Sequence, residues 1–161
     1  MPTAASRPLT ARERFARLVA TLGGVGHAPV APGTVASALT ALALGVLSPS
    51  PLALVVMLLA VILVGTWAAQ EAERSLGGKD PGAIVIDEVA GMALAVLTLP
   101  LTPAVLIAGF VLFRVFDIVK PYPANALQRL PGGVGVMIDD LVAGLYALVL
   151  LVVARALVGW P

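Results

Sequence analysis

Residues 52–69 read LALVVMLLAVILVGTWAA, an uncharged run of apolar and small residues. A run of this length approaches the roughly 20 residues that an α-helix needs to cross a bilayer, and residues 141–158 form a second apolar run, in which Arg155 is the one charged residue. Three shorter apolar stretches occupy residues 35–47, 89–99 and 104–113. A helix of about 14 residues is roughly 21 Å long, less than the roughly 30 Å hydrocarbon core. The shorter helices must therefore extend into their flanks, thin the bilayer locally or stop partway.

The composition also indicates a membrane protein. Of the 161 residues, 60% are hydrophobic and only 12% are charged, whereas soluble domains are about 45 to 50% apolar and about 25% charged. We therefore predict an all-α fold, a small integral-membrane helical bundle in which residues 1–161 form a single membrane-embedded domain. A net charge of only +1 argues against a basic nucleic-acid binder. The absence of cysteine excludes disulfides, thiolate metal sites and a cysteine nucleophile.

Two proline-rich breaks, at residues 48–51 and 100–103, predict tight hairpins between antiparallel helices, because proline ends helices. Residues 1–22 form a basic, amphipathic N-terminus without the continuous apolar core of a secretory signal. With this segment inside, nine of the ten Lys and Arg residues and all nine acidic residues fall on one side, and only Arg155, near Trp160, falls opposite. The excess of Lys and Arg predicts that the polar loops on that side are cytoplasmic.

Two acidic pairs share one pattern, in which an apolar pair precedes two adjacent carboxylates and a glycine follows about one turn later. They are Asp87 and Glu88 with Gly91, and Asp139 and Asp140 with Gly144. Carboxylates at the start of a helix can simply cap free N–H groups. Several carboxylates at one level of a membrane, however, repel one another unless a cation holds them together. Because oxygen ligands suit Mg²⁺, we predict a magnesium site, with Asp117 as a further ligand and glycines that let helices approach closely.

Arg114, Asp117 and Lys120 recur every three residues and therefore share one face of a helix, which Pro121 and Pro123 end. One interpretation is a ladder of salt bridges within the helix at the membrane boundary. The other is functional, because ionisable groups on an apolar helix are costly near lipid and usually mark a site. In that interpretation Arg114 and Lys120 bind phosphate beside Asp117.

Two glycine-rich segments are predicted to be loops, at residues 23–33 and 132–135. Glycine-rich turns before a helix present N–H groups to anions. Thr34 is either the N-cap of the following helix or, with Ser37, a hydrogen-bonding partner of a lipid headgroup. His27, the only histidine, is typical of a loop residue.

Together these motifs resemble the phosphatidylglycerophosphatase A family over about residues 23–144. The residues that carry the resemblance are Pro32, Gly33, Thr34 and Ser37, Ile84 to Glu88 with Gly91, Phe113, Arg114, Asp117 and Lys120 to Pro123, and Gly132 to Asp140 with Ala143 and Gly144. The resemblance implies a multi-pass protein of the bacterial inner membrane, a Mg²⁺-dependent phosphatase of phospholipid biosynthesis. It would hydrolyse phosphatidylglycerophosphate to phosphatidylglycerol and inorganic phosphate. At Gln128 the chain departs from the family, in which an acidic residue is common, so a role for this position is in doubt.

The resulting hypothesis has two groups of residues. The catalytic and metal-binding candidates are Asp87, Glu88, Asp139 and Asp140, with Asp117 as a further metal ligand, and the candidates for substrate phosphate are Arg114, Lys120, Thr34 and Ser37. The nucleophile is either a carboxylate or a water molecule activated by the ion, and Asp80 is a loop or supporting residue.

A small ion-coupled transporter is the alternative, since buried ionisable residues are expected there too. A transporter places such residues near the membrane midplane, whereas here every acidic residue falls at a predicted helix end on one side. The placement therefore favours the phosphatase.

Overall fold

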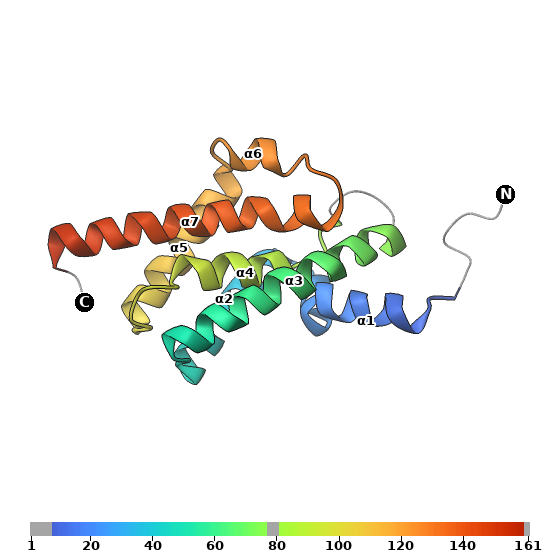
Figure 1. Ribbon diagram of the computed structural model, residues 1–161, viewed down its shortest axis with the longest axis horizontal. Coiled ribbons are helices and arrows are strands. Elements are labelled where there is room, and N and C mark those ends of the chain that lie inside the picture. The colour runs from blue at the N-terminus through green and yellow to red at the C-terminus, as the bar shows by residue number, and fades with distance from the viewer. Residues whose placement is uncertain (1–7, 77–80, 160–161) are drawn as a thin grey trace.

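A computed structural model describes residues 8–76 and 81–159 of the protein. These residues form helices that are connected by short turns (Figure 1). The elements are α1 (Ala11–Ala20), the 3₁₀-helix η2 (Leu22–His27), α2 (Pro32–Leu47), α3 (Pro51–Leu76), α4 (Ile86–Ala95), α5 (Pro103–Val119), α6 (Ala124–Leu127) and α7 (Gly132–Val158). No strand occurs among these described residues, so the predicted all-α fold is confirmed. Arg7, Lys79, Asp80 and Trp160 lie outside them.

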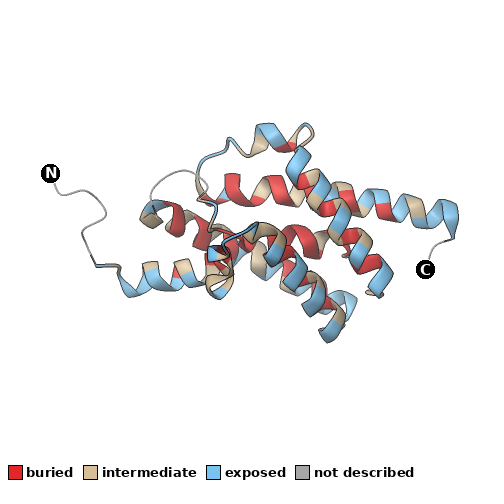
Figure 2. Cartoon of the chain, turned by 180° about the vertical axis from the view of Figure 1, so that it is seen from behind, coloured by how far each residue is buried: buried red, intermediate tan, exposed pale blue. Residues whose placement is uncertain are grey.

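The short helix α4 lies at the centre of the bundle and packs against α2, α3, α5 and α7. It has 10 residues, a length of about 15 Å. Eight of them are buried, namely Ile86, Asp87, Glu88, Ala90, Gly91, Met92, Ala93 and Ala95. Figure 2 shows that burial is concentrated in this middle part of the molecule. The helix α4 is therefore too short to span a bilayer by itself and is enclosed by its neighbours.

The two longest helices, α3 and α7, have 26 and 27 residues and are apolar enough to cross a membrane. At 1.5 Å per residue they are about 39 and 40 Å long, which exceeds the roughly 30 Å hydrocarbon core. They pack against each other and expose large apolar side chains on their outer faces, among them Leu63 and Leu150. These outer faces are suited to contact with lipid.

The apolar stretches predict the helices but not their ends. Residues 104–113 become α5, which continues to Val119, and residues 141–158 become α7, which begins nine residues earlier at Gly132. Both helices extend through charged residues, because an α-helix needs only its backbone hydrogen bonds to continue into a polar environment. Only the stretch at 89–99 ends early, since α4 gives way to a turn after Ala95.

The predicted loop at residues 132–135 is wrong, because these residues form the first turn of α7. The Gly133 N–H donates a hydrogen bond to Gln70 Oε1 on α3 at 3.0 Å. A Cβ atom at Gly133 would overlap the Thr66 carbonyl group of the same helix. Glycine here permits close packing of two helices and is not a sign of flexibility. The sequence predicted Asp139 at the start of the last helix. In the structure it lies about two turns inside α7.

Both proline-rich breaks are turns between helices, as predicted. Ser48 to Ser50 connect α2 to α3, and residues 96–102 connect α4 to α5. Within the described part of the chain, α2 and α3 do not form a close pair, since α2 packs mainly on α4 and α5, and α3 packs mainly on α7 and α1. The prediction that Thr34 caps α2 is wrong, because the helix already begins at Pro32 and its N-cap is Ala31.

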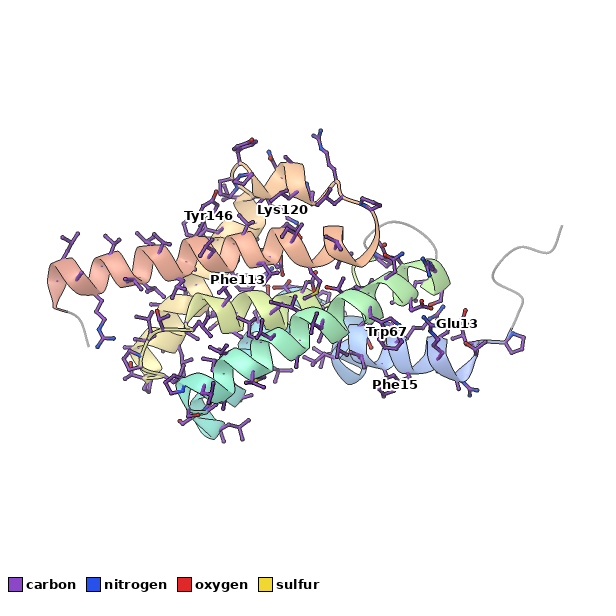
Figure 3. All side chains as sticks on the ribbon, viewed as in Figure 1. Glu13, Phe15, Trp67, Phe113, Lys120 and Tyr146 are labelled. Carbon is purple, nitrogen blue, oxygen red and sulfur yellow. The ribbon has the colours of Figure 1, made fainter. Side chains whose placement is uncertain are left out.

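Within the basic N-terminal segment, Ala11–Ala20 form α1, which packs on α3. Arg12 Nη2 pairs with Glu71 Oε1 at 3.0 Å, and the rings of Phe15 and Trp67 lie with their centroids 6.1 Å apart (Figure 3). The predicted amphipathic character is confirmed for residues 11–20, which bury Ala16 and Ala20 and leave Phe15 half-exposed.

The helices α4 and α7 approach each other closely at the glycines that follow the two acidic pairs. A Cβ atom at Gly144 would overlap the Gly91 carbonyl oxygen, and one at Gly91 would overlap the Phe113 ring and the Asp140 carbonyl oxygen. The predicted role of these glycines in close packing is therefore confirmed. Their backbones bring Asp140 on α7 beside the first turn of α4.

Substituting Gly144 with valine should destabilise the bundle, because the new methyl groups would force α4 and α7 apart. Overpacking of this kind costs about 1 to 3 kcal/mol, measurable as a lower midpoint of unfolding in detergent. Ala156→Val is the matched control, since Ala156 is an exposed residue of the same helix and should tolerate the change. Equal midpoints for the two variants would contradict the close packing at Gly144.

Candidate active site

A polar cavity of about 290 Å³ lies where α2 and α4 begin and α5 ends, beside the first half of α7. The residues that line it are Gly33, Gly82, Ile84, Val85, Asp87, Glu88, Asp117, Ile118, Lys120, Asp139 and Asp140. All five acidic residues predicted from the sequence are in this group. Carboxylates that are up to 53 residues apart in the chain thus share one cavity, and each of them is buried.

Three helices, α4, α5 and α7, contribute the charged side chains of the cavity. Asp87 and Glu88 stand in the first turn of α4. Asp117 is in the last turn of α5, and Lys120 caps that helix in a left-handed conformation with φ of 47°. Lys120 thereby turns toward α7 (Figure 3), where its Nζ atom forms an ion pair with Asp139 Oδ2.

Arg114 joins α4 to α5 behind the cavity. Its Nη1 atom lies 2.5 Å from Glu88 Oε2 and 2.8 Å from Asp117 Oδ2. The predicted sharing of a helix face by Arg114 and Asp117 is confirmed. The ladder of salt bridges considered for this segment is present, but it also extends to a second helix.

Ser37 brings α2 into the same cluster. Its hydroxyl oxygen lies 2.8 Å from Glu88 Oε2 and 2.8 Å from the Gly33 carbonyl oxygen, so its single proton is donated to one of these two acceptors. Ser37 is completely buried. In this structure it therefore orients Glu88 and does not line the cavity, and its proposed contact with phosphate stays a prediction. Thr34, one turn earlier, is half-buried and is also absent from the cavity lining.

Lys120 makes two further contacts. Its Nζ atom donates a hydrogen bond to Gln128 Oε1 at 3.3 Å and lies 3.9 Å from Asp117 Oδ1. Gln128 is a residue that the sequence pattern had placed in doubt. Gln128 is not part of the spacing that relates Arg114, Asp117 and Lys120. It reaches Lys120 only because of the path of the chain through α6.

Two carboxylate oxygens of the cavity, Asp139 Oδ1 and Asp140 Oδ2, are buried and have no hydrogen-bond partner. An unpartnered buried polar atom costs about 1 to 3 kcal/mol, and more when it is charged. Asp140 also interacts electrostatically with Asp87, Glu88 and Asp117. The donor set is thus rich in oxygen and short of positive charge, which fits a hard cation such as Mg²⁺.

The cavity does not hold a complete set of ion ligands in its present side-chain arrangement. Among the described residues, no three acidic or histidine side chains are grouped as ligands of one metal ion. The physical reason is that Arg114 and Lys120 already pair with oxygens of Glu88, Asp117 and Asp139. The magnesium site therefore stays a prediction, supported by the chemistry of the donors.

The environment of the cavity shifts the pKa of Glu88 and that of Lys120, which lie outside the two long helices. Burial raises the pKa of Glu88, and this effect is only partly offset by the charge of Arg114 and by hydrogen bonds from Ser37 and Arg114. Burial alone would lower the pKa of Lys120, but its hydrogen bond to Asp139 and nearby acidic charges raise it on balance. Lys120 is therefore a cation throughout the neutral pH range, available to a phosphate group.

Comparison with known proteins gives one consistent family. A family model described as Phosphatidylglycerophosphatase A matches residues 18–155. Proteins named phosphatidylglycerophosphatase A from Escherichia coli and Haemophilus influenzae are 37% and 36% identical over 131 and 137 residues. These alignments cover 79% and 82% of this chain, and 76% and 83% of the two relatives.

A further relative carries a different name. A Bacteroides thetaiotaomicron protein, provisionally named a phosphatidylinositol-3-phosphatase, is 40% identical over 151 residues, which cover 88% of this chain and 94% of that protein. No solved structure matches the chain. All three relatives are thus named as phosphatases of lipid phosphomonoesters.

Proposed function

The chain belongs to the phosphatidylglycerophosphatase A family, and from this premise we propose that it hydrolyses phosphatidylglycerophosphate to phosphatidylglycerol and inorganic phosphate, with Mg²⁺ as cofactor, in phospholipid biosynthesis. The observation that carries the proposal is the polar cavity, in which five carboxylates and Lys120 converge at one end of apolar helices. In the net reaction the ester bond between phosphorus and the headgroup oxygen breaks, the oxygen of water is added to phosphorus, and a proton from that water goes to the headgroup oxygen, which leaves as the alcohol.

The residues of the cavity divide this work by their contacts. Lys120 lines the cavity and can donate N–H groups to a phosphoryl oxygen, as a point charge. Arg114 lies behind Glu88 and Asp117 and keeps these carboxylates in place. Asp87, Asp139 and Asp140, with Asp117, would hold Mg²⁺. The bound ion would neutralise phosphate charge and activate water.

We also propose that the protein is a multi-pass protein of the bacterial inner membrane with its active site facing the cytoplasm. In Figure 1, α1, which carries Arg12 and Arg17, lies toward the end of the molecule where α7 begins, and α7 ends on the opposite side with Arg155 in its last turn. An excess of Lys and Arg on one side marks that side as cytoplasmic. The transporter alternative is not favoured, because the family is one of phosphatases.

A second substrate follows from the name of the Bacteroides relative, since phosphatidylinositol-3-phosphate is also a lipid phosphomonoester. Both candidates present a phosphate dianion at headgroup level, which the cavity suits equally. The two lipids differ in the bulk of the group that carries the phosphate. A direct comparison of the two substrates therefore decides between them.

Phosphate release by the purified full-length protein in detergent micelles tests the proposal. We expect hydrolysis of phosphatidylglycerophosphate with Mg²⁺, loss of activity with EDTA, and recovery when excess Mg²⁺ is added back. If kcat/KM is higher for phosphatidylinositol-3-phosphate than for phosphatidylglycerophosphate, the inositol lipid is the preferred substrate and the proposed headgroup is wrong. Activity that survives EDTA would refute the cofactor, and failure to release phosphate from either lipid would refute the proposed function.

A further inference from the structure

A second hollow in the protein is lined by apolar residues and is larger than the active-site cavity. It is a groove of about 400 Å³ between α2 and α5. Ala38, Ala41 and Gly45 belong to its wall on α2, and its wall on α5 consists of Pro103, Leu106, Ile107 and Phe110. No charged or hydroxyl-bearing side chain lines it.

The groove begins beside the polar cluster of the active site. Ala38 directly follows Ser37, which contacts Glu88, and Phe110 lies one helical turn before Arg114 on α5. From Ala38 to Val46 the groove runs along about 12 Å of α2. This is comparable to one leaflet of the bilayer, half of a hydrocarbon core of roughly 30 Å.

The shape of the groove suits a thin, flexible occupant. The α2 wall of the groove consists mainly of small residues. Near the end of the groove that is farther from the active site, Gly45 lies so close to α5 that an added Cβ atom would be 3.0 Å from Leu106 Cδ1. The rim is open to the side, since Leu42 and Ile107 are 63% and 65% exposed. The axis of a third helix would have to lie about 8 to 10 Å from the axes of α2 and α5. An unbranched hydrocarbon chain is thinner and can lie between the α2 wall and the α5 wall.

We infer that this groove binds one acyl chain of the lipid substrate and so places the headgroup phosphate at the active-site cavity. The inference rests on the proposed function, since it requires a lipid as the substrate. The acyl chain is in an apolar environment both in the bilayer and in the groove, so the transfer adds little binding free energy. The groove would instead orient the bound lipid. A larger fraction of the bound lipid would then have its phosphate in a reactive position, which raises kcat/KM.

Filling the groove with a large side chain tests the inference. We expect Ala41→Phe to lower kcat/KM at least about tenfold for phosphatidylglycerophosphate with long acyl chains, because a misplaced reactant can cost up to about a hundredfold. The same variant should hydrolyse the deacylated headgroup compound, glycerophosphoglycerophosphate, at the wild-type rate. Ala43→Phe is the matched control, since Ala43 is an exposed residue of α2 outside the groove.

The outcomes separate the groove from the proposed function. If the wild-type protein hydrolyses neither compound, the proposed function fails. If it hydrolyses them but Ala41→Phe and Ala43→Phe behave alike, or if Ala41→Phe loses activity equally on both compounds, the groove is not an acyl-chain site.

Photochemical labelling gives a second readout that does not depend on turnover. Phosphatidylglycerol with a diazirine in one acyl chain should label residues 38–46 and 101–110 in the wild-type protein, and Ala41→Phe should reduce this labelling. Labelling confined to the outer faces of α3 and α7 would overturn the inference. Cross-links that join two copies through α2 and α5 would overturn it as well and identify the groove as an interface between copies.

Discussion

Asp139→Asn should lower kcat/KM for phosphate release at least about 100-fold, the size of effect seen when a charge-stabilising group is removed from an active site. The substitution keeps the shape of the side chain and removes its charge. Asp139 Oδ2 pairs with Lys120, and Asp139 Oδ1 is buried without a partner. The variant therefore loses both the ion pair that places Lys120 and an oxygen available to a cation. Phosphate release in detergent micelles at several Mg²⁺ concentrations measures the effect.

Two further variants make this result interpretable. Asp87→Asn, at the start of α4, should lose activity to a similar extent if the two acidic pairs serve one site. Glu71→Gln should keep wild-type activity, because Glu71 pairs with Arg12 and Arg74 on the outside of the bundle. If Asp87→Asn and Asp139→Asn both retained wild-type turnover, the assignment of the metal site would be wrong.

Arg114→Gln should reduce both stability and activity. Removal of the guanidinium leaves Glu88 and Asp117 buried beside each other without the charge that now lies within 2.8 Å of both. Loss of one partner from a buried ion pair costs about 3 to 5 kcal/mol. Unfolding by denaturant in detergent should show this loss, and kcat/KM should fall at least about 100-fold because the carboxylates of the site move apart.

The double variant Arg114→Gln with Glu88→Gln separates the two effects. Removing both charges should restore much of the stability, since Glu88 is then no longer an unpaired buried charge and Asp117 still lies 3.9 Å from Lys120. Activity should stay low in the double variant, because both Glu88 and Arg114 belong to the proposed site. If stability does not recover, Glu88 is not the main partner of Arg114. If activity recovers fully, neither residue serves the reaction.

The sequence predicts the helices and the composition of the site well, for physical reasons that are local. An apolar run of 18 residues at 52–69 indicates a helix wherever the rest of the chain lies. The spacing of Arg114, Asp117 and Lys120 places them on one helix face without any knowledge of other helices. The two acidic pairs are recognisable because adjacent carboxylates are expensive beside apolar segments.

What the sequence could not predict depends on contacts between distant segments. The contact of Ser37 with Glu88 joins residues 51 positions apart, and that of Lys120 with Gln128 depends on the path of the chain through α6. The same limit explains the error at Gly132 to Gly135. The sequence does not distinguish a glycine that allows a loop to bend from a glycine that allows another helix to pack closely. Here the close contact is with Thr66 on α3, which only the folded structure shows.

The close contact of Gly91 with Gly144 has a mechanical consequence for α7. A long membrane helix tilts when the thickness of the hydrocarbon core changes, and the point of tightest packing acts as its pivot. Gly144 lies only four residues after Asp140, but eleven residues before Arg155. A change of tilt about this contact would displace Asp140 less than Arg155, because Asp140 lies nearer to the contact along the helix. The position of the glycine contact would therefore limit the movement of the carboxylates in the cavity when α7 tilts.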